Sequence, residues 1–125
     1  MRKVIAIIAL VFGVMINAQG QTATVKKITL EQTQGEFTQK QLTVSEGTYV
    51  FAIDNNNVGH NVGFVLVPKG KDISDPANHI KTAYVTAPVA NNTVGNSKPT
   101  KLAKGEYVFF CPLNPTSTDN VLIVK

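Results

Sequence analysis

Residues 47–55 carry the clearest structural signal in the chain and read Gly47-Thr48-Tyr49-Val50-Phe51-Ala52-Ile53-Asp54-Asn55. Successive side chains of a β-strand point to opposite faces, so Tyr49, Phe51 and Ile53 would share one face. Val50 and Ala52 would share the other face. Because both faces are apolar, we predict that Thr48–Asp54 is a central strand of a β-sheet.

Similar short stretches of period-two alternation, separated by turn residues, run through the rest of the chain beyond residue 20. The further strands that we predict are Val25–Glu31, Phe37–Val44, Asn61–Val67, an edge strand near Thr93 and Val94, Glu106–Cys111 and Val121–Val124. One or two helical turns are expected after Asp75-Pro76, because Asp suits a helix N-cap and Pro the first helical position. The pattern predicts an all-β, antiparallel β-sandwich of about six to eight strands.

The N-terminal residues 1–20 have a different character. Arg2 and Lys3 precede the apolar run Val4–Ile16, whose 13 residues fall short of the roughly 20 that a membrane-spanning helix needs. Small residues follow, and a signal peptidase could cut after Ala18 or after Gly20. We therefore predict a signal peptide over residues 1–20, one domain over residues 21–125, and export to the periplasm or out of the cell.

Size, charge and composition exclude several function classes. The chain has 125 residues, of which 43% are hydrophobic and one is Cys, so it fits one globular domain and not a disulfide-stapled or disordered chain. The only arginine is Arg2 and the lysines are scattered, so we do not expect nucleic-acid binding. The carboxylates are spread singly, and no G-x-S-x-G, P-loop or H-E-x-x-H motif occurs, so we do not expect an enzyme.

Three segments together resemble the cupredoxins, the plastocyanin and azurin type of blue-copper protein, in a likeness that spans most of residues 36–125. The segments are Gly47–Asn55, Gly59-His60-Asn61-Val62 and Gly105-Glu106-Tyr107-Val108-Phe109-Phe110-Cys111-Pro112. The resemblance implies a Greek-key β-sandwich with one copper ion near one end. In that family a His, a Cys that ends the penultimate strand, a second His soon after the Cys and usually a weakly bound Met hold the ion. His60 and Cys111 fall on the first two positions.

The residue types at these two positions suit the implied chemistry. A blue-copper site combines one thiolate with two imidazoles, a compromise that suits both Cu(I) and Cu(II). The chain departs from the family pattern after Cys111, because residues 112–125 contain neither His nor Met. The remaining copper ligands would then be His79, Asn114, Thr116 or a backbone oxygen, although His79 is expected in an exposed loop.

Two functions stay open at this point. In the first, the domain binds a single copper ion through Cys111 and His60 for electron transfer or copper handling, with a redox or copper-delivery protein as partner. In the second, Cys111 is a small buried hydrophobe and backbone carbonyls satisfy His60. The domain is then a metal-free binding or structural module, whose contact surface would be the Pro112–Asn120 loop and residues 71–100.

Overall fold

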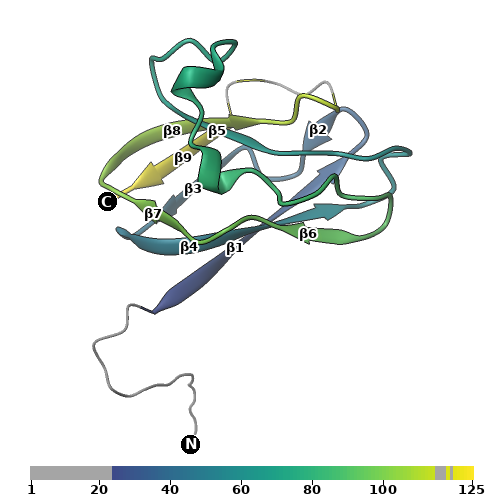
Figure 1. The fold of residues 1–125 in the computed structure, drawn as a ribbon, viewed down its shortest axis with the longest axis horizontal. Coiled ribbons are helices and arrows are strands. Elements are labelled where there is room, and N and C mark those ends of the chain that lie inside the picture. The colour runs from purple at the N-terminus through teal and green to yellow at the C-terminus, as the bar shows by residue number, and fades with distance from the viewer. Residues whose placement is uncertain (1–23, 115–117, 119) are drawn as a thin grey trace, which may run out of the picture.

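Two β-sheets pack face to face in the computed structural model, which describes residues 24–114, 118 and 120–125 (Figure 1). Within these residues the strands are β1 (Val25–Thr33), β2 (Glu36–Phe37), β3 (Gln41–Val44), β4 (Gly47–Asn55), β5 (Val65–Pro68), β6 (Val94–Asn96), β7 (Thr100–Leu102), β8 (Gly105–Phe110) and β9 (Asn120–Val124). One sheet has the order β2-β1-β4-β6, with β7 also paired to β4, and the other has the order β3-β9-β8-β5. The predicted β-sandwich is confirmed, and β4 is a central strand as expected.

The strand pairing is mixed and not purely antiparallel. β1 runs parallel to β4, and β3 runs parallel to β9, while the other strand pairs are antiparallel. A parallel pair needs a crossover connection, and the chain between β1 and β4 makes one by passing through β3 in the other sheet. Period-two alternation does not reveal this, because it reports which face a side chain occupies and not the direction of the neighbouring strand.

Several strand boundaries differ from the predicted ones. The predicted strand Phe37–Val44 is divided into β2 and β3, which belong to different sheets, and the predicted strand Asn61–Val67 is shortened to β5. Val62 makes only an isolated bridge to Val89, and β7 was not predicted at all. The part of the chain that is described therefore holds nine strands where about six to eight were expected.

The core lies between the two sheets and is built around aromatic rings. Phe37 meets Phe109 edge to face with ring centroids 4.9 Å apart, and Phe51 lies 4.9 Å from Phe64. Such pairs contribute about 0.5–1.5 kcal/mol beyond the area that they bury. The faces expected from alternation are confirmed, since the core cluster includes Ile28, Leu30, Tyr49, Phe51, Ile53, Tyr107, Phe109 and Cys111.

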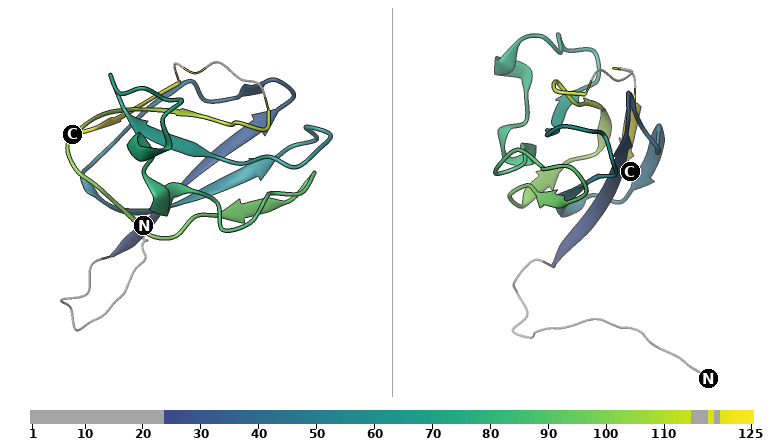
Figure 2. Two further views of the ribbon diagram at one scale, coloured as in Figure 1. Left: turned by 45° about the horizontal axis from the view of Figure 1, so that its top comes forward. Right: turned by 90° about the vertical axis from the view of Figure 1, so that its right-hand side faces the viewer.

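An excursion of the chain between β5 and β6 lies beside the edge strand β5 (Figures 1 and 2, teal to green), and its residues Ala83 and Val89 join the core cluster. It contains two short 3-10 helices, η1 (Pro76–Asn78) and η2 (Lys81–Ala83). The Asp75 side chain caps η1 by accepting a hydrogen bond from the Ala77 amide, which confirms the helical turn predicted after Asp75-Pro76. The backbone amide of Ile80 donates to the Leu66 carbonyl and fastens the excursion to β5.

Two sequence predictions concern the N-terminal region. The predicted signal peptide, residues 1–20, lies outside the described residues and stays a prediction, as does the domain boundary after it. Within the residues that the structure describes, no helix has the length and apolar character needed to cross a membrane.

Candidate functional site

Cys111 follows the last residue of β8 and is 3% exposed within the core cluster. The Gly63 amide donates a hydrogen bond to its Sγ atom at 3.2 Å. The antiparallel register of β5 and β8 explains this contact, because Val65 pairs with Phe110 and the preceding residues of the 56–64 connection then pass beside Cys111. The thiol is therefore part of the packed interior at one end of the sandwich.

His60 belongs to the same 56–64 connection, but its side chain is exposed. Asn55, which is buried, donates from Nδ2 to the His60 backbone carbonyl at 2.8 Å and so fixes the backbone of the loop. Gly59, in the left-handed region at φ 102°, directs the chain into this turn. The His60 Nδ1 atom lies 2.8 Å from the neighbouring Asn61 carbonyl oxygen. The structure thus brings Cys111 and the His60 loop to the same end of the sandwich, with the thiol buried and the imidazole at the surface.

His79 lies between η1 and η2 and is half-buried, so the expectation of an exposed loop residue is wrong. Its Nδ1 atom lies 2.7 Å from the Tyr84 hydroxyl and its Nε2 atom 2.8 Å from the Ile73 carbonyl oxygen. Its ring packs edge to face on Phe110 at 6.2 Å. Neighbouring residues of an extended segment point to opposite sides, so Phe110 faces the excursion while Cys111 faces the core. His79 therefore lies on the other side of the sheet from the thiol.

Asn114 is 2% exposed and joins two loops through its amide group. Its Nδ2 atom donates to Gln32 Oε1 at 3.0 Å and to the Thr33 carbonyl at 2.9 Å, and its Oδ1 atom accepts from the Gly35 amide at 2.9 Å. Gln32, fully buried, donates in turn from Nε2 to the Gly63 carbonyl at 2.9 Å. Asn114, proposed as a weaker metal ligand, uses both amide atoms in this amide network. Thr116, the other weaker candidate from this loop, lies outside the described residues.

The amide network includes one residue that the sequence reasoning missed. Gln32 continues the inward alternation of Ile28 and Leu30 along β1, so its side chain enters the core. A polar residue on the apolar side of a strand signals a buried hydrogen bond, because an unpaired amide in the interior is costly. That signal was present in the sequence, but it does not name the partners Gly63 and Asn114.

A cavity of about 570 Å³ lies between the excursion and the outer side of β5 and β8. The residues that line it are Val62, Gly63, Phe64, Val65, Ile73, Ser74, His79, Tyr84, Val85, Thr86, Ala87, Pro88, Phe110, Pro112 and Leu113. The lining is mostly apolar and contains no Lys, Arg, Asp or Glu side chain. Residues 73–88 and residues 112–113 meet here, which are parts of the two segments predicted to form a contact surface.

The excursion begins with a local polar turn. The Asp72 carboxylate accepts hydrogen bonds from Ser74 Oγ at 2.7 Å and from the Ser74 amide at 3.0 Å. These bonds stabilise the charged form and lower the pKa of Asp72 below its ordinary value. Ser74, which lines the edge of the cavity, therefore donates its hydroxyl proton in a hydrogen bond to Asp72.

Comparison with known families identifies the fold's relatives. Residues 24–118 match the family of copper binding proteins of the plastocyanin/azurin type. The chain belongs to this family. A comparison with curated proteins gives no match.

Solved cupredoxin structures share the fold. Auracyanin A, a "blue" copper protein from Chloroflexus aurantiacus, superposes with a TM-score of 0.64 at 21% identity, covering 82% of this chain and 100% of its own. Auracyanin B superposes with a TM-score of 0.63 at 18% identity, covering 85% of this chain and 92% of its own. The reduced auracyanin of Roseiflexus castenholzii superposes with a TM-score of 0.62 at 20% identity, covering 83% of this chain and 99% of its own. The cupredoxin fold expected from the sequence is confirmed.

The copper that the family implies can be tested against the donors of this cupredoxin. The chain has two His. His60 is exposed at the same end of the sandwich as the Cys111 thiol, and His79 lies on the other side of the sheet. Among the described residues, no group of three or more His, Cys, Asp or Glu side chains could hold a metal ion. These donors do not form the one-thiolate, two-imidazole set of a blue-copper centre. Copper binding through Cys111 and His60 stays a prediction.

Proposed function

We propose that this cupredoxin is a binding module that works without a blue-copper centre and binds its ligand in the cavity beside β5 and β8. The observation that carries the proposal is the meeting of residues 73–88 and 112–113 around one apolar cavity. Its volume falls within the roughly 300–1,000 Å³ of small-molecule sites, which are mostly apolar with a few polar groups. The sequence left a metal-free binding module open as one of two functions, and this cavity supports that alternative.

The end of the sandwich at which Cys111 lies supports the same proposal. Gln32 and Asn114 bond to each other and to the backbone of Thr33, Gly35 and Gly63, so two loops of this end are held by amide groups. Buried hydrogen bonds of this kind fix loop positions, because breaking one leaves a buried polar atom unsatisfied. Loop placement at this end therefore has a source that does not depend on a metal ion.

The test compares copper with neutral aromatic fragments on the purified domain of residues 21–125. Fragments should shift the backbone amide resonances of Ser74, Tyr84 and Thr86, and the same shifts should occur in Cys111→Ser. Cu(II) should give no intense visible thiolate-to-copper absorption. The proposal fails if the fragments leave these amides unchanged while Cu(II) produces a stoichiometric coloured site that Cys111→Ser removes.

A second candidate is copper handling as Cu(I) through Cys111 and His60, and one contact favours it. The Gly63 amide donates to Cys111 Sγ and so holds the connection that carries His60 beside the thiol. His60 lies three residues before Gly63 on the same connection. In this candidate a copper-delivery or redox protein would be the partner, and export would place the domain outside the cytoplasm.

The second candidate is tested by competition for Cu(I) against a coloured chelator. Cys111→Ser and His60→Ala should each lower the Cu(I) affinity, whereas His79→Ala, the control on the other side of the sheet, should leave it unchanged. Equal Cu(I) affinity in the original chain and in Cys111→Ser would remove this candidate.

A further inference from the structure

We infer that the cavity takes an uncharged, largely apolar small molecule that carries a hydroxyl group, and that this hydroxyl donates a hydrogen bond to the Tyr84 oxygen. The inference rests on the proposed function, because it names the class of ligand for the same cavity. Three properties of the wall lead to it: its charge, the direction of its hydrogen bonds and its apolar rim.

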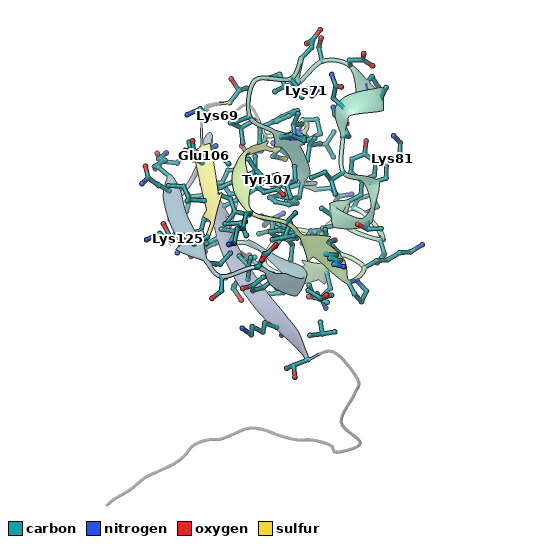
Figure 3. The ribbon with its side chains drawn as sticks, turned by 90° about the vertical axis from the view of Figure 1, so that its left-hand side faces the viewer. Lys69, Lys71, Lys81, Glu106, Tyr107 and Lys125 are labelled. Carbon is teal, nitrogen blue, oxygen red and sulfur yellow. The ribbon has the colours of Figure 1, made fainter. Side chains whose placement is uncertain are left out.

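The wall of the cavity sets the charge of the ligand. None of its residues is Lys, Arg, Asp or Glu. Lys71 and Lys81 belong to the excursion, but they are exposed, and Figure 3 shows both at the outer side of the molecule. Lys69 pairs with Glu106 at 3.0 Å and is likewise outside the lining. A charge placed among apolar side chains without a partner is strongly unfavourable, so the buried part of the ligand is uncharged.

The hydrogen bonds of His79 fix the role of Tyr84. The Ile73 carbonyl can only accept, so the His79 Nε2 atom, 2.8 Å away, carries a proton and donates it. In a neutral imidazole the Nδ1 atom then has no proton and accepts from the Tyr84 hydroxyl at 2.7 Å. The Tyr84 hydroxyl therefore donates its proton to His79, and the lone pairs of its oxygen can accept a hydrogen bond from a ligand.

Ser74 leads to the same preference from an independent contact. Its Oγ atom lies 2.7 Å from Asp72 Oδ1, and because a carboxylate only accepts, the Ser74 hydroxyl donates to it. Two of the hydroxyl groups in the lining, those of Tyr84 and Ser74, therefore present acceptors. A ligand with an O–H group can donate to these two oxygens, whereas neither of them has a proton left for a ligand that carries only acceptor atoms.

The rim explains why the rest of the ligand is apolar. Leu113 is 50% exposed and is one of the large hydrophobic side chains at the surface of the described residues. It adjoins Pro112, and both line the cavity together with the half-buried ring of Phe110. Covering these groups with an apolar ring removes their surface from water, which stabilises the complex.

The experiment uses two matched probes, 2-naphthol and 2-methoxynaphthalene, which differ in whether the oxygen carries a proton. Binding to the purified domain is followed by probe fluorescence and by calorimetry. We expect 2-naphthol to bind about 5-fold more tightly, the factor that corresponds to one net hydrogen bond. Tyr84→Phe should weaken 2-naphthol and leave 2-methoxynaphthalene within about 2-fold.

Two further variants complete the design. In Tyr84→Phe the His79 Nδ1 atom becomes the nearest acceptor, so the double variant Tyr84→Phe/His79→Leu is measured as well and should bind both probes equally. Ala87→Phe adds a bulky ring at an exposed position of the lining and should weaken both probes, whereas Ala90→Phe, at an exposed position outside the lining, should weaken neither.

The outcomes separate this inference from the proposed function. A preference for 2-naphthol that disappears in the Tyr84 variants, together with loss of binding in Ala87→Phe, supports the inference. Equal affinity for both probes in the original chain, with binding still lost in Ala87→Phe, overturns the hydroxyl ligand and leaves the cavity as a binding site. Absence of binding, or binding that Ala87→Phe does not weaken, overturns both.

Discussion

The two sides of β8 differ in what they offer to other molecules. On the inner side, Cys111 is buried in the core cluster, and the nearby Gln32 and Asn114 have their amide groups bonded to the chain itself. On the outer side, Phe110 and the excursion line an open cavity with two hydroxyl acceptors. The same strand thus contributes to a packed interior on one side and to the wall of an apolar cavity on the other.

This difference shows how a family fold and a family function can separate. The sandwich depends on alternating apolar side chains, which the chain retains, whereas a blue-copper centre depends on a few donors at fixed places. Residues 112–125 lack His, and the chain's other imidazole, His79, is bonded on the outer side. Membership of the family therefore settles the architecture of this chain more firmly than its chemistry.

The largest expected effect is a difference in stability between variants of two neighbouring phenylalanines, Phe109 and Phe110. Phe109→Ala empties a fully buried site between the sheets and should lower the free energy of unfolding by about 3–5 kcal/mol. Phe110→Ala alters the half-buried wall of the cavity and should cost less than half as much, because it leaves the core intact. Chemical denaturation of both variants checks this. Equal losses would show that the outer side contributes as much to stability as the core.

Removing one amide from the network at the Cys111 end should have the next largest effect. Gln32→Met keeps the length of the side chain but takes a hydrogen-bond partner from the Gly63 carbonyl and from Asn114 Nδ2. We expect a loss of about 2–3 kcal/mol in the free energy of unfolding, since buried polar groups are left unsatisfied. Gln34→Met, at an exposed position two residues along, is the control and should change stability little. A near-neutral Gln32→Met would mean that the network does not hold these loops.

A smaller effect is expected on the outer side. Tyr84→Phe removes the hydroxyl that donates to His79 and should cost about 1 kcal/mol, because the pair is only partly buried. Thermal unfolding followed by circular dichroism measures the change, with Lys98→Met on the neighbouring surface as a control. A loss as large as that of Gln32→Met would indicate that the outer pair supports the fold and not only the cavity.

The smallest effect concerns the start of the excursion. Ser74→Ala removes the hydroxyl bond to Asp72, so the lowered pKa of Asp72 should rise toward its ordinary value. A carboxyl whose folded pKa is depressed contributes stability above its unfolded pKa, and this contribution disappears as the pH falls through the folded pKa. The variant should therefore show a weaker loss of stability on acidification. NMR titration of the Asp72 carboxyl checks the direction, and an unchanged pKa would contradict it.

Much of the fold could be predicted from local patterns. Alternation placed Tyr49, Phe51 and Ile53 on one inward face and Cys111 in line with Tyr107 and Phe109. The same rule, applied two residues beyond Leu30 along β1, points Gln32 into the core. These predictions succeed because the period of a strand is set by the backbone and needs no knowledge of distant contacts.

The candidate site could be predicted only in part. The resemblance selected Cys111 and His60, and the loop composition selected the two segments that meet at the cavity. The bonds of His79 to Tyr84 and Ile73 depend on how η1 and η2 fold over β5. No spacing in the sequence signalled them, because the roles of these side chains follow from the path of an irregular loop.

By itself, the sequence determined the sandwich, the inward side of each long strand and the cupredoxin family, because all three rest on side-chain patterns within single segments. The tertiary structure alone decided that β1 and β4 run parallel, that His79 lies on the opposite side of the sheet from Cys111, and that residues 73–88 and 112–113 line a cavity. These features depend on the sheet in which each strand is placed and on the register between strands. Both are set by contacts between residues far apart in the chain, which a local pattern does not encode.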